Sequence, residues 1–158
     1  MEIHVAEVTD APEILALQKL AYLSEAKIYN DYTLPPLTQT LEELKAEFGC
    51  RTILKAVSGG LVVGSVHGCM VAGCCHIGRL MVHPALQGRG IGTKLMHAIE
   101  KIFVAAESWE VFTGELSVRN IRLYKKLGYR VARKERFAGN RFNVVFMRKE
   151  TNMKERND

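Results

Sequence analysis

Hydrophobic and polar positions along the chain repeat with two different periods, and the changes between them mark out helices and strands. Residues 3–8 (IHVAEV) have the alternation of a short strand. Across residues 10–26 the apolar positions recur every three or four residues, which predicts an amphipathic helix that begins at an aspartate. Residues 29–40 contain two prolines and several turn-forming residues, so they predict a loop. Thr40 is then a suitable N-cap for a helix over residues 41–48, which the following glycine ends.

The pattern then changes to that of strands. Three runs rich in apolar and β-branched residues, at 52–57, 61–71 and 76–82, are separated by SGG and AGC, which predicts consecutive antiparallel strands. The later pattern predicts a helix, a strand, a helix and two strands, at residues 92–106, 109–113, 120–128, 129–137 and 142–149. The last two strands surround the turn AGN. The order β-α-α-β-β-β-α-β-α-β-β predicts one α/β domain over residues 1–149 with a mixed sheet, followed by a charged tail at 150–158.

The composition is that of an ordinary globular protein. The 158 residues are 47% hydrophobic and 25% charged, and a chain of this length can bury a core without disulfides. The net charge of +5 is a modest excess, which suits an anionic small ligand as well as nucleic acid. No apolar run reaches membrane-spanning length and no signal segment is evident, so we expect a cytoplasmic protein without a membrane contact.

The cysteines do not have the spacing of a zinc site or of a disulfide framework. They are Cys50, Cys69, Cys74 and Cys75. A group that lies close together in the sequence is His67, Cys69, Cys74 and His76. Successive residues of a strand point to opposite faces, so this group would need a special turn to converge on a metal ion. We therefore expect small core residues at these positions and no metal site.

Three alternate glycines stand between a predicted strand and a predicted helix, in QGRGIG at residues 87–92. Such a turn leaves backbone N–H groups unpaired at the start of a helix, where the helix dipole favours phosphate. The pattern is neither GxxxxGK[ST] nor GxGxxG, since Thr93 stands where the second pattern needs glycine. A turn that only reversed the chain would not need Gly92, because glycine inside a helix costs about 1 kcal/mol relative to alanine. The sequence therefore predicts a phosphate-binding turn of another kind.

Two segments resemble motifs of the GNAT superfamily of N-acetyltransferases. LMVHPALQGRGIGTKLM resembles motif A, whose signature [QR]-x-x-G-x-[GA] is filled by Gln87, Gly90 and Gly92. NIRLYKKLGY, residues 120–129, is similar to the family's helix that carries Asn and Tyr and ends in Gly-[Phe/Tyr]. The order of predicted elements also matches. The resemblance implies an α/β GNAT fold with a single mixed, mostly antiparallel sheet of about seven strands, flanked by four helices, with the fourth and fifth strands splayed apart.

The resemblance implies acetyl-CoA as the co-substrate, without a metal, bound in the gap between the fourth and fifth strands. The pantetheine arm would pair with the backbone of Leu80, Met81 and Val82, and the N–H of Leu80 is expected to polarise the thioester carbonyl. Asn120 would hydrogen-bond the same arm. The pyrophosphate would bind at Gln87, Gly88, Arg89, Gly90, Ile91, Gly92 and Thr93.

Tyr124 is the candidate catalytic residue. The family reaction is direct attack of an amine on the thioester through a tetrahedral intermediate, and a phenol with a pKa near 10 can protonate the departing thiolate. Tyr124 lies four residues after Asn120, so both share one helical face.

The general base is left open by the sequence. Many family members have an acidic residue on the fourth strand where this chain has Gly78. His76 has the strand parity of Gly78 and Leu80, so we expect it to face the same side. His67 and Glu115 are further candidates, and relay of the proton by water is an alternative to all three.

The acceptor site is expected near the predicted loop. Glu25 and Tyr32, with nearby tyrosines and Asp31, would form a pocket for a cationic amine, and His76 is a further acceptor-site candidate; the alternative is an exposed polar loop. The predicted function is acetylation of a primary amine of a small molecule or peptide. The alternative is a degenerate CoA-binding or regulatory module.

Nucleic-acid binding is disfavoured, because the basic residues of the C-terminal third lack interleaved aromatic residues. These basic residues are Arg122, Lys125, Lys126, Arg130, Arg133, Lys134 and Arg136. They are expected near the 3′-phosphate of CoA, so attraction of that anion accounts for some of them. Members of the superfamily often pair through the last strands or the sheet edge, so a homodimer is also an expectation.

Overall fold

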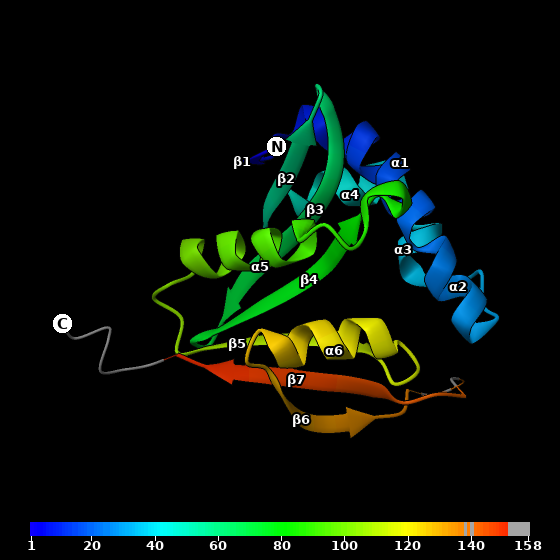
Figure 1. Cartoon of the computed structure of the whole chain (residues 1–158), viewed down its shortest axis with the longest axis vertical. Helices are drawn as coiled ribbons and strands as arrows, with labels where there is room; N and C mark the ends of the chain where they lie inside the picture. The colour runs from blue at the N-terminus through cyan, green and yellow to red at the C-terminus, as the bar shows by residue number, and fades with distance from the viewer. Residues whose placement is uncertain (138, 140, 152–158) are drawn as a thin grey trace.

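One mixed sheet runs through the described part of the chain (Figure 1). This computed structural model describes residues 1–137, 139 and 141–151. Its strands are β1 (Glu2–Val5), β2 (Thr52–Ser58), β3 (Leu61–Val71), β4 (Cys74–Val82), β5 (Ser108–Gly114), β6 (Arg130–Glu135) and β7 (Val144–Glu150). They follow the order β1-β2-β3-β4-β5-β7-β6, and only β4 and β5 among these neighbours are parallel. The predicted sheet is confirmed; residues 138 and 140 of the AGN turn and residues 152–158 of the tail lie outside the described residues.

The described residues form more helical segments than the sequence pattern predicts. These are α1 (Ala11–Ala21), α2 (Leu23–Tyr29), α3 (Pro35–Thr38), α4 (Leu41–Glu47), α5 (Ile91–Ile102) and α6 (Val118–Lys126). The helix predicted over 10–26 is divided at Tyr22, where ψ of 0° departs from helical geometry. The predicted loop contains α3, which begins at Pro35 because a proline at the first helical position loses no hydrogen bond.

The boundaries of the other helices follow local chemistry. The predicted N-cap of α4 is confirmed: Thr40 Oγ1 accepts from the N–H of Glu43 at 3.2 Å, and Glu43 Oε1 accepts from the N–H of Thr40 at 3.0 Å. α5 ends at Ile102 rather than at the predicted residue 106, because the backbone of Phe103 leaves helical geometry (φ −100°, ψ 38°). Two short 3₁₀ helices are present, Val8–Asp10 and Pro84–Leu86.

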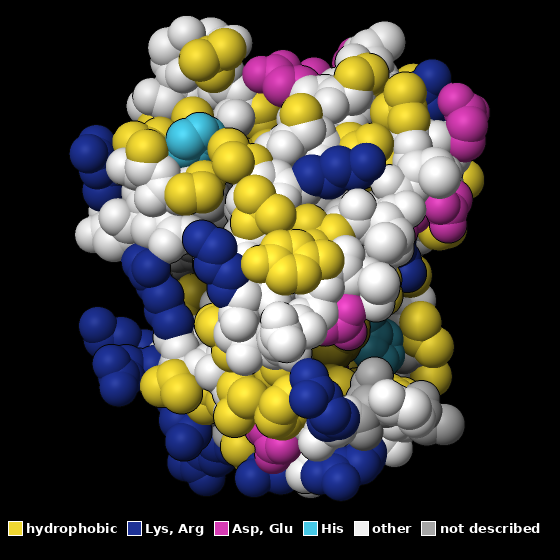
Figure 2. Space-filling view, turned by 90° about the vertical axis from the view of Figure 1, so that its right-hand side faces the viewer, with side chains coloured by type: hydrophobic (Ala, Val, Ile, Leu, Met, Phe, Trp, Pro, Cys, Tyr) yellow, Lys and Arg dark blue, Asp and Glu magenta, His cyan; other side chains and the backbone are white. Residues whose placement is uncertain are grey.

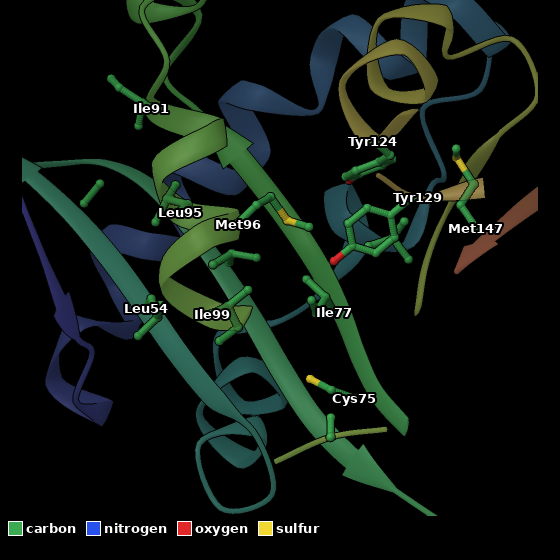
Figure 3. Packing of buried hydrophobic residues seen from close by; sticks show 14 of the residues in the cluster. Leu54, Cys75, Ile77, Ile91, Leu95, Met96, Ile99, Tyr124, Tyr129 and Met147 are labelled. Carbon is green, nitrogen blue, oxygen red and sulfur yellow. The ribbon is translucent and has the colours of Figure 1, made fainter. Parts of the chain in front are cut away.

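Helices cover both faces of the sheet (Figure 1). α5 packs on β2, β3 and β4 through Ile91, Leu95, Met96 and Ile99 (Figure 3). Two glycines of β3 allow this close approach, since a Cβ on Gly64 would lie 2.9 Å from Leu95 Cδ1 and one on Gly68 would lie 2.7 Å from Phe103 Cε2. The opposite face is covered by α1 and α4, which bury Ile14, Leu17 and Leu44.

The parallel strands β4 and β5 are joined over only part of their length. The residue pairs are Cys74–Ser108, Cys75–Trp109 and His76–Glu110. Beyond them β5 continues to pair with β7 as far as Gly114, whereas the edge of β4 toward β5 has no strand partner among the described residues. The predicted separation of the fourth and fifth strands is therefore confirmed (Figure 1).

A bulge in β4 reverses the direction of its side chains. Arg79 has φ of 51°, and the two residues Arg79 and Leu80 lie opposite the single residue Val66 of β3. Ile77 before the bulge and Leu80 after it both pack in the cluster beneath α5. His76 therefore points to the face opposite Leu80, and the expected common direction of these two side chains is wrong.

A buried carboxylate joins the three C-terminal strands. The Glu110 side chain on β5 is 5% exposed and accepts hydrogen bonds from Arg133 of β6 and Arg148 of β7, the shortest at 3.0 Å. Burial alone raises the pKa of Glu110, but the hydrogen bonds and charges of the two arginines outweigh burial and hold this pKa below its usual 4.5. Folding therefore favours the ionised form.

We expect Glu110→Ala to lower the free energy of unfolding by about 2 kcal/mol, since it removes the carboxylate that two half-exposed guanidinium groups share. Because the pKa of Glu110 is lower in the folded state, the contribution is present above the unfolded value of 4.5 and is lost as the pH falls through the folded value. Urea unfolding at about pH 7 and about pH 3 measures both effects. Glu42→Ala on the exposed face of α4 is the control, at less than about 0.5 kcal/mol. An equal cost of Glu110→Ala at both pH values would contradict this assignment.

Candidate active site

A cavity of about 550 Å³ lies where β4 and β5 separate. Its walls come from α2 and the segment after it, from β3 to β5, from α6, and from the loop between β6 and β7. The volume is that of a small-molecule site. The predicted site residues that line it are Glu25, Asp31, His67, Leu80, Asn120 and Tyr124. The cavity thus brings together side chains from opposite halves of the chain, and it is the candidate active site.

Tyr124 presents its hydroxyl to this cavity from α6. The residue is only 6% exposed, and its ring packs edge-on against Tyr129 with 6.0 Å between the ring centroids (Figure 3). Among the described residues its hydroxyl has no hydrogen-bond partner. Burial raises the pKa of Tyr124 above its usual 10, and nearby Tyr22 and Glu25 raise it further. The phenol is therefore protonated at neutral pH and free to donate.

A polar network surrounds Glu25 on α2. Glu25 Oε2 accepts from Ser117 Oγ at 2.5 Å, and Glu25 Oε1 accepts from Asn120 Nδ2 at 3.4 Å. Asn120 Nδ2 also lies 3.3 Å from Thr113 Oγ1, to which it donates. Ser117 Oγ is 2.7 Å from the hydroxyl of Tyr29. The network orients the amide of Asn120 and holds the Glu25 carboxylate beside Tyr124.

Ser117 and Gly114 were not foreseen from the sequence. A Cβ on Gly114 would overlap the Tyr29 hydroxyl, so the glycine provides the space in which Tyr29 accepts from the N–H of Leu116 at 3.0 Å. Ser117 stands immediately before α6, where a serine normally caps the helix, yet its side chain makes no capping hydrogen bond and turns to Glu25 instead. The sequence pattern predicts this helix only from residue 120, so no local signal marked Ser117.

The predicted phosphate turn lies at the start of α5. Gly88 and Gly90 have φ of 78° and 81°, and Gly90 is the N-cap residue. A Cβ on either glycine would meet nothing within 4 Å, so the turn is open to a ligand. A Cβ on Gly92 would lie 3.7 Å from Leu123 of α6, which places the turn beside the helix that carries Tyr124. Gln87 Oε1 accepts from Arg119 Nη1 of that helix at 2.5 Å.

Several other predicted residues lie away from the cavity. Tyr32 is 55% exposed and does not line it, and His76 is exposed with Nδ1 4.0 Å from Glu110. Met81 is buried on the α1 face, whereas Val82 packs against the cluster beneath α5. Glu115 Oε1 accepts from the backbone N–H of Asn143, in the loop that precedes β7, at 2.9 Å. The structure therefore does not bring His76 or Glu115 to the wall of the cavity.

Gly78 leaves space for His67 of the neighbouring strand. A Cβ on Gly78 would lie 2.6 Å from His67 Nε2, so the imidazole covers β4 at the position where many family members have an acidic side chain. On the other side of the ring, His67 Nδ1 is 4.0 Å from Glu47 Oε2, a buried oxygen without a hydrogen bond among the described residues. Glu47 was not singled out by the sequence.

The His67 imidazole is neutral at neutral pH. Burial, together with the positive charges of Arg51 and Arg79, lowers the pKa of His67 to about 3. The contact with Glu47 is therefore not an ion pair under these conditions. A neutral imidazole ring that lines the cavity can donate one hydrogen bond and accept one.

Basic side chains gather in the lower part of the face shown in Figure 2, where α6, β6 and β7 lie in Figure 1. Arg133 and Arg148 of this region are bound to Glu110.

Within the described ranges, no three His, Cys, Asp or Glu side chains are grouped closely enough to hold a metal ion. Of the four free cysteines only Cys75 is buried, and burial raises the pKa of its thiol to about 12. No helix in the described part of the chain is both long and apolar enough to span a membrane.

Comparison with known proteins shows the class to which this fold and site belong. The sequence model of the Acetyltransferase (GNAT) family matches residues 14–129, so the chain belongs to that family. A curated relative, the UPF0157 protein YqkA of Bacillus subtilis (strain 168), is 29% identical over 126 residues, or 80% of this chain. The match spans 36% of the length of that relative.

Solved structures share the fold. The PaiA N-acetyltransferase from Thermoplasma acidophilum, in complex with coenzyme A, has a TM-score of 0.79 and 17% identity over 94% of this chain and 98% of its own. The ribosomal-protein-S18-alanine N-acetyltransferase from Escherichia coli has a TM-score of 0.80 and 16% identity over 96% of this chain and 94% of its own. At these identities the likeness is one of fold.

A double-mutant cycle tests whether a side chain at position 78 would overlap the His67 ring. Gly78→Ala should lower the free energy of unfolding by about 1–3 kcal/mol, because the new methyl group meets His67 Nε2. In a His67→Ala background the same change should cost less than about 0.5 kcal/mol, since the space is then vacant. Denaturant unfolding of the four proteins measures the coupling. Gly49→Ala, whose Cβ would lie 3.4 Å from the Ala46 carbonyl oxygen, is the matched control. Equal costs in both backgrounds would contradict the overlap.

Proposed function

We propose that this protein transfers the acetyl group of acetyl-CoA to the primary amine of a small molecule or peptide. The observation that carries the proposal is the cavity at the separation of β4 and β5, with the unpartnered hydroxyl of Tyr124 on its wall. Membership of the GNAT family supports the acetyl transfer.

The chain has features that suit CoA at two places. The edge of β4 toward β5 has no strand partner beyond His76 among the described residues, so an extended pantetheine arm can pair there along Leu80. At the start of α5, the backbone N–H groups around Gly88 and Gly90 are open and the helix dipole favours phosphate. The two places are joined through the last residues of β4.

The cavity also supplies the groups that the transfer needs. The neutral amine attacks the thioester carbon, and the N–H of Leu80 stabilises the oxyanion of the tetrahedral intermediate. When the carbon–sulfur bond breaks, Tyr124 donates its proton to the thiolate. The Glu25 carboxylate attracts the ammonium form of the acceptor into the site. The proton that the ammonium form loses before attack passes to water in the open cavity. The second proton leaves the nitrogen as the tetrahedral intermediate collapses, and it returns through water to the Tyr124 oxygen, which restores the phenol.

Two measurements test the proposal against a module that only binds CoA. Acetyl-CoA should raise the thermal unfolding temperature in either case. Release of free thiol in the presence of a panel of primary amines should occur only if the protein is an acetyltransferase. Stabilisation by acetyl-CoA without thiol release from any amine would favour the binding module, and no stabilisation would contradict both.

Tyr124→Phe should reduce kcat by about 100-fold or more, because it removes the proton donor, while KM for acetyl-CoA changes little. Since burial raises the pKa of the Tyr124 hydroxyl, ionisation of this residue should not lower wild-type kcat at any pH below about 10. Steady-state thiol release across pH measures both. The ring contact with Tyr129 is kept, so an unchanged unfolding temperature is the control. Wild-type turnover of the variant with a good acceptor would exclude the acid role.

Gly90→Ala should weaken acetyl-CoA binding by about 10-fold or more, because the added Cβ disfavours the left-handed backbone at φ of 81° and blocks the turn. Gly59→Ala is the matched control: its φ is 58°, its Cβ would also meet nothing within 4 Å, and it lies in the turn between β2 and β3. Titration calorimetry should show weaker binding for Gly90→Ala alone, although both variants lose stability. Equal binding by both variants would argue against a pyrophosphate site at this turn.

A further inference from the structure

One arginine on the cavity wall has no counterion. Arg79 lines the cavity and is half-buried, yet it makes no hydrogen bond or ion pair with any residue that the structure describes. A guanidinium group that is partly removed from water without an anionic partner is unfavourable. An anion is therefore the ligand that this position would bind most readily.

The backbone at Arg79 is also unfavourable for a residue with a side chain. Its φ of 51° lies in the left-handed region at the bulge of β4. A residue with a side chain is disfavoured in this region, and glycine would avoid that strain. Backbone strain of this kind tends to occur at functional sites, where the side chain has a role that offsets it. The strain and the missing counterion are independent observations on the same residue.

The other charged side chains of the cavity already have partners. Arg51 Nη1 donates to Glu47 Oε1 at 2.8 Å. The carboxylates of Glu25 and Asp31 accept hydrogen bonds from neighbouring hydroxyl groups. Arg141 Nη2 lies 3.5 Å from a backbone carbonyl oxygen, to which it donates. Among the described charged side chains of the cavity wall, Arg79 is therefore the one that has neither a hydrogen bond nor an ion pair.

Arg79 lies on the acceptor side of the cavity rather than on the phosphate side. Together with His67 it also borders a small space between the sheet and the helices α1 and α4, beside Glu47 and Met81. The glycine turn is at the start of α5, which covers the opposite face of the sheet. The CoA pyrophosphate, bound at that turn, would not neutralise Arg79.

The chemistry around Arg79 favours a carboxylate as the anion that this arginine binds. We propose that the acceptor is an amine that also carries a carboxylate, of which a free α-amino acid is the simplest example, and that Arg79 binds this carboxylate. A single guanidinium group matches one carboxylate through two parallel hydrogen bonds, and the neutral His67 beside it adds no second cation for a phosphate dianion. This inference rests on the proposed acetyl transfer.

The position of Arg79 suits an acceptor whose two charged groups are close together. Arg79 directly precedes Leu80, whose N–H is assigned to the thioester, so a carboxylate on Arg79 keeps the amine near the acetyl group. Leu34, Pro35, Phe112 and Phe142 also line the cavity and provide apolar surface for the rest of the acceptor. L-Phenylalanine is therefore the first probe.

The test compares L-phenylalanine with L-phenylalaninamide, which lacks only the negative charge, and with spermidine, which has no carboxylate. Wild-type protein should acetylate the amino acid with the highest kcat/KM. Arg79→Gln should reduce the ratio of kcat/KM for phenylalanine to that for its amide by about 10- to 100-fold, through loss of a charged hydrogen bond. Arg79→Gly, which relieves the backbone strain, should reduce this ratio equally and remain folded. Lys19→Gln, at an exposed cation of α1, should leave the ratio unchanged.

Two results would overturn the inference without affecting the proposed function. One is a wild-type preference for spermidine or for the amide, and the other is a ratio that does not change in either Arg79 variant. If no amine is acetylated, the proposed function fails, and the carboxylate site is tested by thermal unfolding in the presence of CoA and each probe. A stabilisation by phenylalanine that Arg79→Gly abolishes would support the site. Equal effects of phenylalanine and its amide would refute it.

Discussion

The early end of the pairing between β4 and β5 is the constraint on which the rest of this structure depends. After His76 the two strands follow different neighbours, β4 remaining with β3 and β5 with β7. The gap is bridged by aromatic residues from the end of α6. Tyr129 donates to the buried Glu100 of α5 at 2.7 Å, which connects the two halves of the sheet. The cavity can therefore exist beside a well-packed core.

Glycines determine which side chains reach the cavity. Gly78 and Gly114 lie on strands at either side of the gap, and each is covered by an aromatic or imidazole ring from another element, His67 and Tyr29. Any side chain at these two positions would displace those rings. The consequence is a site whose polar groups come from the N-terminal helices and from β3 as well as from the strands that form the gap.

Much of the fold and part of the site could be predicted because they depend on local geometry. Strand and helix periods follow from the backbone alone, and the glycines of the turn before α5 occupy positive φ values that other residues disfavour. Asn120 and Tyr124 are four residues apart, so a single helix places both on the cavity wall. Glu25 joins them there through Ser117, a residue that no local pattern marked.

What could not be predicted depends on register between strands. The bulge at Arg79 has no local marker, yet it turns His76 away from the direction expected for it. The space above Gly78 is taken by His67 only because β3 and β4 are paired with those two residues opposite each other.

The sequence by itself determined the family, the order of the strands, the glycine turn before α5 and the tyrosine that faces the cavity, since each is encoded within a few consecutive residues. Only the tertiary structure decided which charged residues meet at the cavity and which one lacks a partner. Such pairings join residues far apart in the chain, and their energies depend on burial and distance, which no short segment specifies.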